Sequence, residues 1–186
     1  MKIYLVLSIA CILHAMPAFS QEEKKEEELE YEGYDEGRHI ANLGFGLGLD
    51  YGGIGAQLGF LPVKSVSIFG SIGYNLVSAG YNGGIAFLLA PNKKVCPKFV
   101  AMYGYNAVIV VQGTSQYNKT YYGPSIGGGI HINMRNDQNF INIELFVPFR
   151  SSEFSNDLKA LKNNSAIADV RDPLPVTFSI GYHIKL

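Results

Sequence analysis

The C-terminal segment of the chain alternates between apolar and polar residues without a break. The apolar set reaches the last residue and consists of Val176, Phe178, Ile180, Tyr182, Ile184 and Leu186. The residues between them are small or polar, namely Thr177, Ser179, Gly181, His183 and Lys185. Because successive side chains of a β-strand point to opposite faces, the pattern predicts a strand with one continuous apolar face.

Seven further segments show the same alternation, so we expect about eight strands. Together with the C-terminal segment, the eight predicted strands cover residues 40–50, 53–61, 65–75, 80–89, 98–111, 122–134, 139–149 and 174–186. Their lengths are near the roughly 9–11 residues of a tilted membrane-spanning strand. The phase of segment 98–111 stays open, because Val100 and Met102 are as apolar as Tyr103 and Tyr105.

The polar faces of these strands carry few charges. By the alternation, only Asp50, Glu144 and Lys185 place a formal charge there, whereas Lys, Arg, Asp and Glu make up roughly a quarter to a third of a soluble surface. Such faces suit a narrow barrel lumen, with the apolar faces toward lipid. The predicted fold is therefore all-β, a single antiparallel up-and-down transmembrane β-barrel spanning residues 38–186.

The connections between the predicted strands fall into two groups. Residues 61–64, 90–94 and 135–138 form compact turns that contain Pro, Asn or Asp. Residues 50–53, 76–79, 112–121 and 150–173 alternate with them and include the two longest connections. Outer-membrane barrels have short periplasmic turns and longer surface loops, so we expect the second group at the cell surface.

The N-terminal region is expected to lie outside the barrel. Lys2, the apolar stretch 3–13 and the small residues around Ala18 and Ser20 predict a cleaved signal peptide over residues 1–20. Residues 22–36 then hold nine acidic side chains against two lysines. Such a segment has little to bury and repels itself, so residues 21–37 are predicted to be an acidic, disordered periplasmic tail.

The signal peptide, the glycine-rich alternating strands and the ending from Ser179 to Leu186 resemble the small eight-stranded outer-membrane barrels of Gram-negative bacteria, the OmpA/OmpX-like class. The resemblance implies a location in the cell outer membrane with periplasmic termini. It also implies contact with outer-membrane lipid, including lipopolysaccharide, and with the barrel assembly machinery during insertion. Ser179, Gly181, Ile184 and Leu186 form the candidate assembly signal, although Ile184 and Leu186 replace the aromatic residues usual in the family.

Five polar residues are candidates for a network inside the lumen: His131, Asn142, Glu144, His183 and Lys185. A turn centred between residues 136 and 137 would place His131 opposite Asn142. Buried charges must be paired, so we expect an ionic network that fills the lumen, with a gating or proton-sensitive plug as the alternative. An eight-stranded barrel is wide enough only for its own side chains or one small ligand.

No catalytic, cofactor, metal or nucleic-acid motif is evident in the sequence. A comparison with lipid A deacylases places Asn133 where a serine nucleophile would be needed, so we expect no enzymatic activity. The sequence predicts a structural or surface-interaction role, with loop 150–173 and its short amphipathic helix, capped by Asn156, as the candidate partner surface. The alternatives are a secreted, soluble lipocalin-like barrel that binds an apolar ligand and a narrow small-solute pore.

Overall fold

The computed structural model describes residues 39–111, 116–135, 138–164 and 173–186. Two compact units divide the chain, residues 1–37 and residues 38–186. The predicted signal peptide and acidic tail belong to the first unit and lie outside the described residues.

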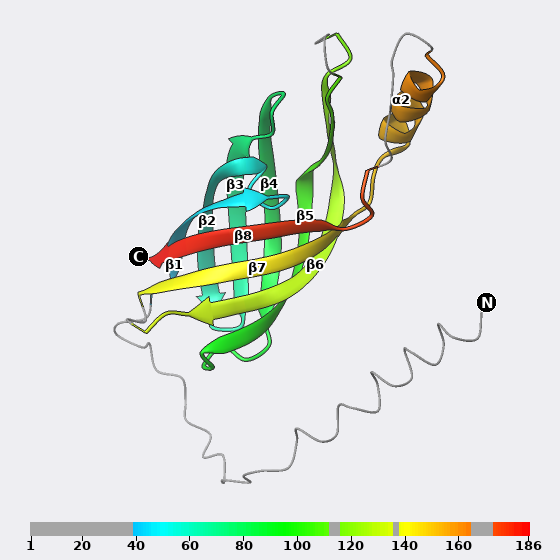
Figure 1. The fold of residues 1–186 in the computed structure, drawn as a ribbon. Helices are drawn as coiled ribbons and strands as arrows, with labels where there is room; N and C mark the ends of the chain where they lie inside the picture. Colours follow the sequence, from blue (N-terminus) through cyan, green and yellow to red (C-terminus); the bar gives the residue numbers. More distant parts are fainter. Residues whose placement is uncertain (1–38, 112–115, 136–137, 165–172) are drawn as a thin grey trace, which may run out of the picture. The chain divides into compact units, whose positions relative to one another are not determined.

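The second unit is a closed antiparallel barrel in which each strand pairs with its neighbours in sequence and the last pairs with the first (Figure 1). The strands are β1 (Ala41–Gly48), β2 (Gly53–Val63), β3 (Val66–Tyr74), β4 (Ala79–Leu88), β5 (Val95–Ile109), β6 (Lys119–Asn133), β7 (Asn139–Pro148) and β8 (Thr177–Lys185). The predicted all-β class and the eight antiparallel strands are confirmed.

The barrel wall separates two kinds of side chain. Most of the large apolar side chains on the strands face outward, and they include Phe45, Leu47, Ile54, Leu58, Phe60, Ile68, Ile72, Ile85, Phe87, Phe99, Leu145, Phe178 and Ile184. The buried polar side chains include Asn42, Asp50, Gln57, Asn82, Lys98, Asn106, Ser125, His131, Asn142, Glu144, Ser179 and His183. Part of the lumen is nevertheless apolar, where Leu49, Phe69, Ala86, Val100, Met102 and Phe146 form a cluster.

Strand β5 resolves the phase that the sequence left open. Lys98, Val100 and Met102 are buried, whereas Phe99 and Tyr103 are exposed on the outer face. The strand begins at Val95, before the predicted start at residue 98, and Cys96 is therefore buried on the same face as Lys98. The lumen thus holds a fourth charged side chain in addition to those predicted.

The connection between β1 and β2 enters the lumen, which corrects the prediction of a surface loop at residues 50–53. Leu49, Asp50 and Tyr51 are 5%, 2% and 0% exposed. Asn82 Nδ2 donates to the Leu49 carbonyl at 2.8 Å, and the Ser71 hydroxyl donates to the Asp50 carbonyl. We call residues 49–52 the inner turn. The apolar alternation of residues 40–50 would place Leu49 on the outer face, but the structure buries it in the lumen.

Strands β5 and β6 continue past the rest of the barrel as a long hairpin, pairing up to Ile109 and Lys119. Helix α2 (Ser152–Lys162) packs against this hairpin. Their shared apolar cluster consists of Ala107, Ile109, Tyr121, Phe154 and Leu161. The predicted helix is confirmed, but its N-terminal cap differs.

The cap of α2 is Ser151, whose hydroxyl accepts a hydrogen bond from the Phe154 backbone N–H at 3.2 Å. A cap at Asn156 was wrong, because that residue lies inside the helix. In the described part of the chain, no helix has the length and apolar character needed to cross a membrane.

Candidate functional site: the barrel lumen

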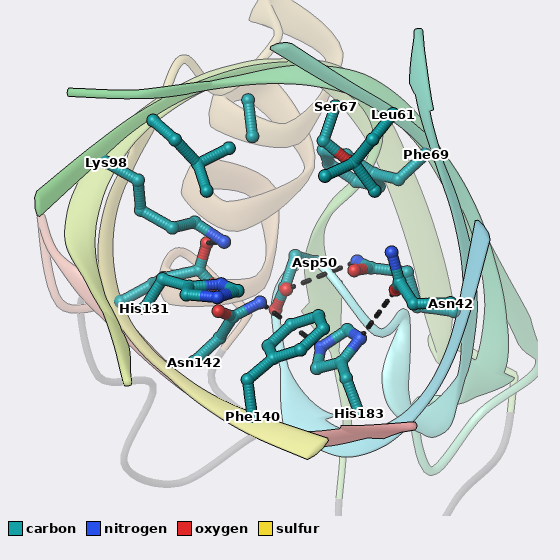
Figure 2. Close-up of a pocket in the computed structure, with 14 residues that line it drawn as sticks. Asn42, Asp50, Leu61, Ser67, Phe69, Lys98, His131, Phe140, Asn142 and His183 are labelled. Carbon is teal, nitrogen blue, oxygen red and sulfur yellow. Dashed lines mark hydrogen bonds and ion pairs between the residues drawn. The ribbon is translucent and has the colours of Figure 1, made fainter. Parts of the chain in front are cut away.

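A small cavity lies inside the barrel, between the inner turn and the strands around it (Figure 2). Its volume is about 30 Å³, which leaves room for roughly one or two water molecules. The lining side chains are Asn42, Asp50, Gln57, Leu61, Ser67, Phe69, Ala86, Leu88, Lys98, His131, Phe140, Asn142, Glu144 and His183. Side chains of the protein therefore occupy most of the lumen.

The strongest electrostatic contact in the lumen joins β5 to β7. Lys98 Nζ lies 2.7 Å from Glu144 Oε1, and the two side chains are only 7% and 2% exposed. Asp50 of the inner turn lines the same cavity, so two carboxylates share the surroundings of one ammonium group. Gln57 Nε2 donates to Asp50 Oδ2 at 3.4 Å. Glu144 is therefore paired, as a buried charge requires, and its partner is Lys98, which is not among the five candidate residues.

Two histidines and a phenylalanine stack across β6, β7 and β8. The Phe140 ring lies between them, with centroid distances of 4.1 Å to His131 and 4.5 Å to His183. The Phe140 and His183 rings are nearly parallel, at an interplanar angle of 8°. In Figure 2 these rings lie side by side at one edge of the cavity.

The hydrogen bonds of His183 connect the inner turn to the last strand. Its Nδ1 lies 3.0 Å from Asn42 Oδ1, so this nitrogen carries the proton when the amide oxygen accepts. Its Nε2 then accepts from the Tyr51 hydroxyl at 2.6 Å and from Asn142 Nδ2 at 3.2 Å. His183 is thus held as a neutral imidazole whose two nitrogens both have partners.

Glycines provide the space for Tyr51. A Cβ at Gly181 would lie 1.8 Å from the Tyr51 hydroxyl oxygen, and a Cβ at Gly46 would lie 2.6 Å from the Tyr51 ring. Both distances are far shorter than a van der Waals contact, so any side chain at either position displaces Tyr51. The absence of a side chain at Gly181 therefore has a structural explanation within the lumen.

The strand register places the other predicted lumen residues. His131 is the cross-strand partner of Asn142, which confirms the pairing deduced from the turn between β6 and β7. Glu144 pairs with Ser179, one step further along the barrel. Lys185 is half-buried opposite Asn42, at the end of β8.

Three residues of the candidate assembly signal lie in β8, and Leu186 directly follows the strand. Ser179 is buried, and its hydroxyl accepts from the Leu49 backbone N–H at 2.8 Å. Gly181 faces Tyr51, whereas Ile184 and Leu186 are 41% and 60% exposed. Their role in assembly stays a prediction.

The positions compared with a deacylase site do not form a hydroxyl nucleophile and base. His131 Nε2 lies 3.2 Å from Asn133 Oδ1, and Asn133 Nδ2 donates to the Lys93 carbonyl at 3.3 Å. Within the described ranges, no group of three or more His, Cys, Asp and Glu side chains is arranged to hold a metal ion. The lumen is suited to holding the strands together through a dense polar network.

A second polar cluster lies outside the lumen, between α2 and the β5–β6 hairpin. Lys119 Nζ contacts Glu153 at 2.8 Å and Asp157 at 2.9 Å, and the Tyr121 hydroxyl donates to Asp157 at 2.7 Å. The hydrogen bonds from Lys119 and Tyr121 lower the pKa of the Asp157 carboxyl below its ordinary value of 3.8. Charge therefore reinforces the apolar packing of the helix on the hairpin.

No protein-family model matches this chain, and no curated protein matches it at a significant level.

Proposed function

We propose that this chain is an integral β-barrel of the bacterial outer membrane with a structural or surface-interaction role. The observation that carries the proposal is the reversal of polarity across the wall. Outward side chains such as Ile54, Leu58 and Phe45 are 71%, 58% and 54% exposed, while the lumen buries amides, carboxylates and imidazoles. A monomeric soluble protein seldom exposes a large continuous apolar surface.

Neither alternative is supported as well by the lumen. A lipocalin-like carrier needs an interior with space for its ligand, but the cavity deep in the lumen measures only about 30 Å³, and its lining combines apolar side chains with charged and amide groups. A solute pore needs an open path, and the inner turn with Tyr51 lies across the lumen. In this view, the polar network of the lumen stabilises the barrel, and the outer surfaces carry the function.

The first and last residues of the barrel lie at the same end of it. His39 Nδ1 lies 3.1 Å from the Leu186 carbonyl oxygen, as the even number of strands requires. We place this end in the periplasm. The β5–β6 hairpin and α2 follow odd-numbered strands and project from the opposite end (Figure 1), so they would be presented at the cell surface as the contact region for a partner.

The residues on the outer wall would contact membrane lipid, including lipopolysaccharide, and the barrel assembly machinery would recognise β8 during insertion. Both partners follow from the resemblance of the C-terminal strand to outer-membrane barrels. No cofactor is needed for this function.

A matched pair of Leu→Arg variants tests the membrane assignment. Leu58 lies in the middle of β2 and is 58% exposed, whereas Leu76 lies in the β3–β4 connection and is 72% exposed. In lipid vesicles, Leu58→Arg should lower the free energy of unfolding by about 2–4 kcal/mol, and Leu76→Arg should have little effect. If both variants unfold like the wild type in urea titrations, the outer wall does not face hydrocarbon and the proposal fails.

A further inference from the structure

A second cavity, of about 480 Å³, lies where the β7–β8 pairing ends at the mouth of the barrel. Its lining includes Leu49 and Asn106, which are buried inside the barrel, and Leu145 and Phe178, which are exposed on the outer wall. The cavity therefore connects the mouth of the lumen with the outer apolar surface. We call it the lateral pocket. Its volume lies within the roughly 300–1,000 Å³ of typical small-molecule sites.

The secondary structure explains why the wall opens here. The last pair between β7 and β8 is Phe146 with Thr177, whereas β5 and β6 remain paired well beyond that level. Above the last pair, the two segments are joined through the Arg150 side chain, whose Nη2 donates to the Leu174 carbonyl. A side-chain contact thus replaces the backbone ladder and leaves space beneath it.

The walls of the lateral pocket are apolar but include three buried polar atoms without a hydrogen-bond partner. These atoms are Asn106 Oδ1, Arg150 Nε and Thr177 Oγ1. Asn106 is only 2% exposed, and a buried polar group without a hydrogen-bond partner is destabilising. A ligand that fits must fill apolar volume, and an acceptor group on it can receive hydrogen bonds from the Arg150 guanidinium and the Thr177 hydroxyl.

We propose that the lateral pocket binds the acyl chain of an anionic membrane lipid, which passes over Leu145 and Phe178 on the outer wall and enters above the last β7–β8 pair. The apolar walls receive the chain, and Arg150 binds the negatively charged head group. This inference rests on the proposed membrane location, since the lipid must reach the pocket through the apolar outer surface. It adds a specific ligand site to a barrel whose lumen is otherwise filled.

A fluorescence experiment can test the site because the chain contains no tryptophan. Three variants each introduce one reporter: Tyr105→Trp in the pocket lining, Tyr103→Trp on the outer wall and Phe69→Trp in the lumen. Each is refolded into vesicles of phosphatidylcholine and phosphatidylglycerol whose acyl chains carry bromine, a short-range quencher. The emission of Tyr105→Trp should fall nearly as much as that of Tyr103→Trp, while that of Phe69→Trp should stay close to its value in unbrominated lipid.

The outcomes separate this inference from the proposed function. If Tyr103→Trp is not quenched, the membrane location itself is wrong. If Tyr103→Trp is quenched and Tyr105→Trp is protected like Phe69→Trp, the barrel is in the membrane but the pocket takes no acyl chain. Leu174→Trp, at an exposed lining position, gives a second reporter if Tyr105→Trp does not refold.

The head-group assignment has its own test. Quenching of Tyr105→Trp should rise when brominated phosphatidylglycerol replaces brominated phosphatidylcholine, and Arg150→Gln should abolish that rise. Quenching of Tyr103→Trp should not depend on Arg150. Equal quenching of Tyr105→Trp by the two lipids would overturn the assignment of Arg150 to an anionic head group.

Discussion

Replacing Lys98 by methionine should be one of the most destabilising single changes in the barrel. The substitution preserves most of the side-chain volume but removes the ammonium group that lies 2.7 Å from Glu144. Glu144 and Asp50 then remain buried around one cavity without that cation. Breaking a buried ion pair by removing one partner costs about 3–5 kcal/mol, and we expect a loss of that size in the free energy of unfolding.

The reciprocal change should cost less. In Glu144→Gln, Lys98 keeps Asp50 as a second carboxylate in the same cavity, so the loss should be closer to the roughly 1–3 kcal/mol of an impaired buried hydrogen bond. The double variant should be more stable than the sum of the two losses predicts, because no carboxylate at position 144 is left opposite methionine. A coupling energy of about 0.5–3 kcal/mol is usual for residues in contact.

Urea unfolding in detergent micelles, followed by circular dichroism, measures these differences. Lys119→Met is the matched control, because Lys119 also contacts two carboxylates but is 46% exposed. Its effect should be too small to resolve against that of Lys98→Met. If Glu144→Gln is as damaging as Lys98→Met, or if the two losses simply add, the account of two carboxylates sharing one cation is refuted.

Three further predictions concern other parts of the structure. Gly181→Ala should prevent Tyr51 from reaching His183 and should lower the midpoint of urea unfolding. Adding Tyr51→Leu to this variant should restore part of the lost stability. A gel that separates folded from heat-unfolded barrel checks this, and a double variant no more heat-resistant than Gly181→Ala would contradict it. In a variant that lacks Cys96, Ser155→Cys on α2 should react with an impermeant thiol reagent on intact cells. Asn92→Cys in the β4–β5 turn should react only after permeabilisation. Labelling of both variants on intact cells would contradict the topology. Because the pKa of Asp157 is lowered in the folded state, its contribution to helix docking is present above pH 3.8 and is lost as the pH falls through the lower, folded-state pKa. The emission of a tryptophan placed in α2 should therefore change at acid pH, and Asp157→Asn should remove that change.

Alternation along the chain was sufficient to predict most of the barrel. In β8, apolar residues on the outer wall alternate with small or polar residues in the lumen, so the period of two is visible without any structure. The pairing of His131 with Asn142 followed from the position of one tight turn. These features are local, and local sequence determines them.

The features that the sequence did not reveal depend on contacts between distant segments. Leu49 continues the apolar alternation of β1, yet it is buried because pairing with β2 stops at Gly48 and Gly53. Gly48, Gly52 and Gly53 have φ values of 131°, 68° and 110°, which allow the chain to fold inward. The role of Lys98 was hidden because both faces of β5 carry large apolar residues. The need for a cation to pair with the buried Glu144 was the one feature of the sequence that pointed to a lysine such as Lys98 in the lumen.

The inner turn also constrains the order in which the barrel can assemble. It belongs to the first hairpin, but Leu49 and Tyr51 bond to Ser179 and His183 of the last strand, 130 and 132 residues further along the chain. Such distant contacts are slow to form, because the entropy of bringing distant segments together is lost before the contacts stabilise the fold. Strand β8 therefore completes its interactions only when the first turn is already seated inside. We therefore expect closure of the barrel by β8 to be coupled to the seating of the inner turn in the lumen.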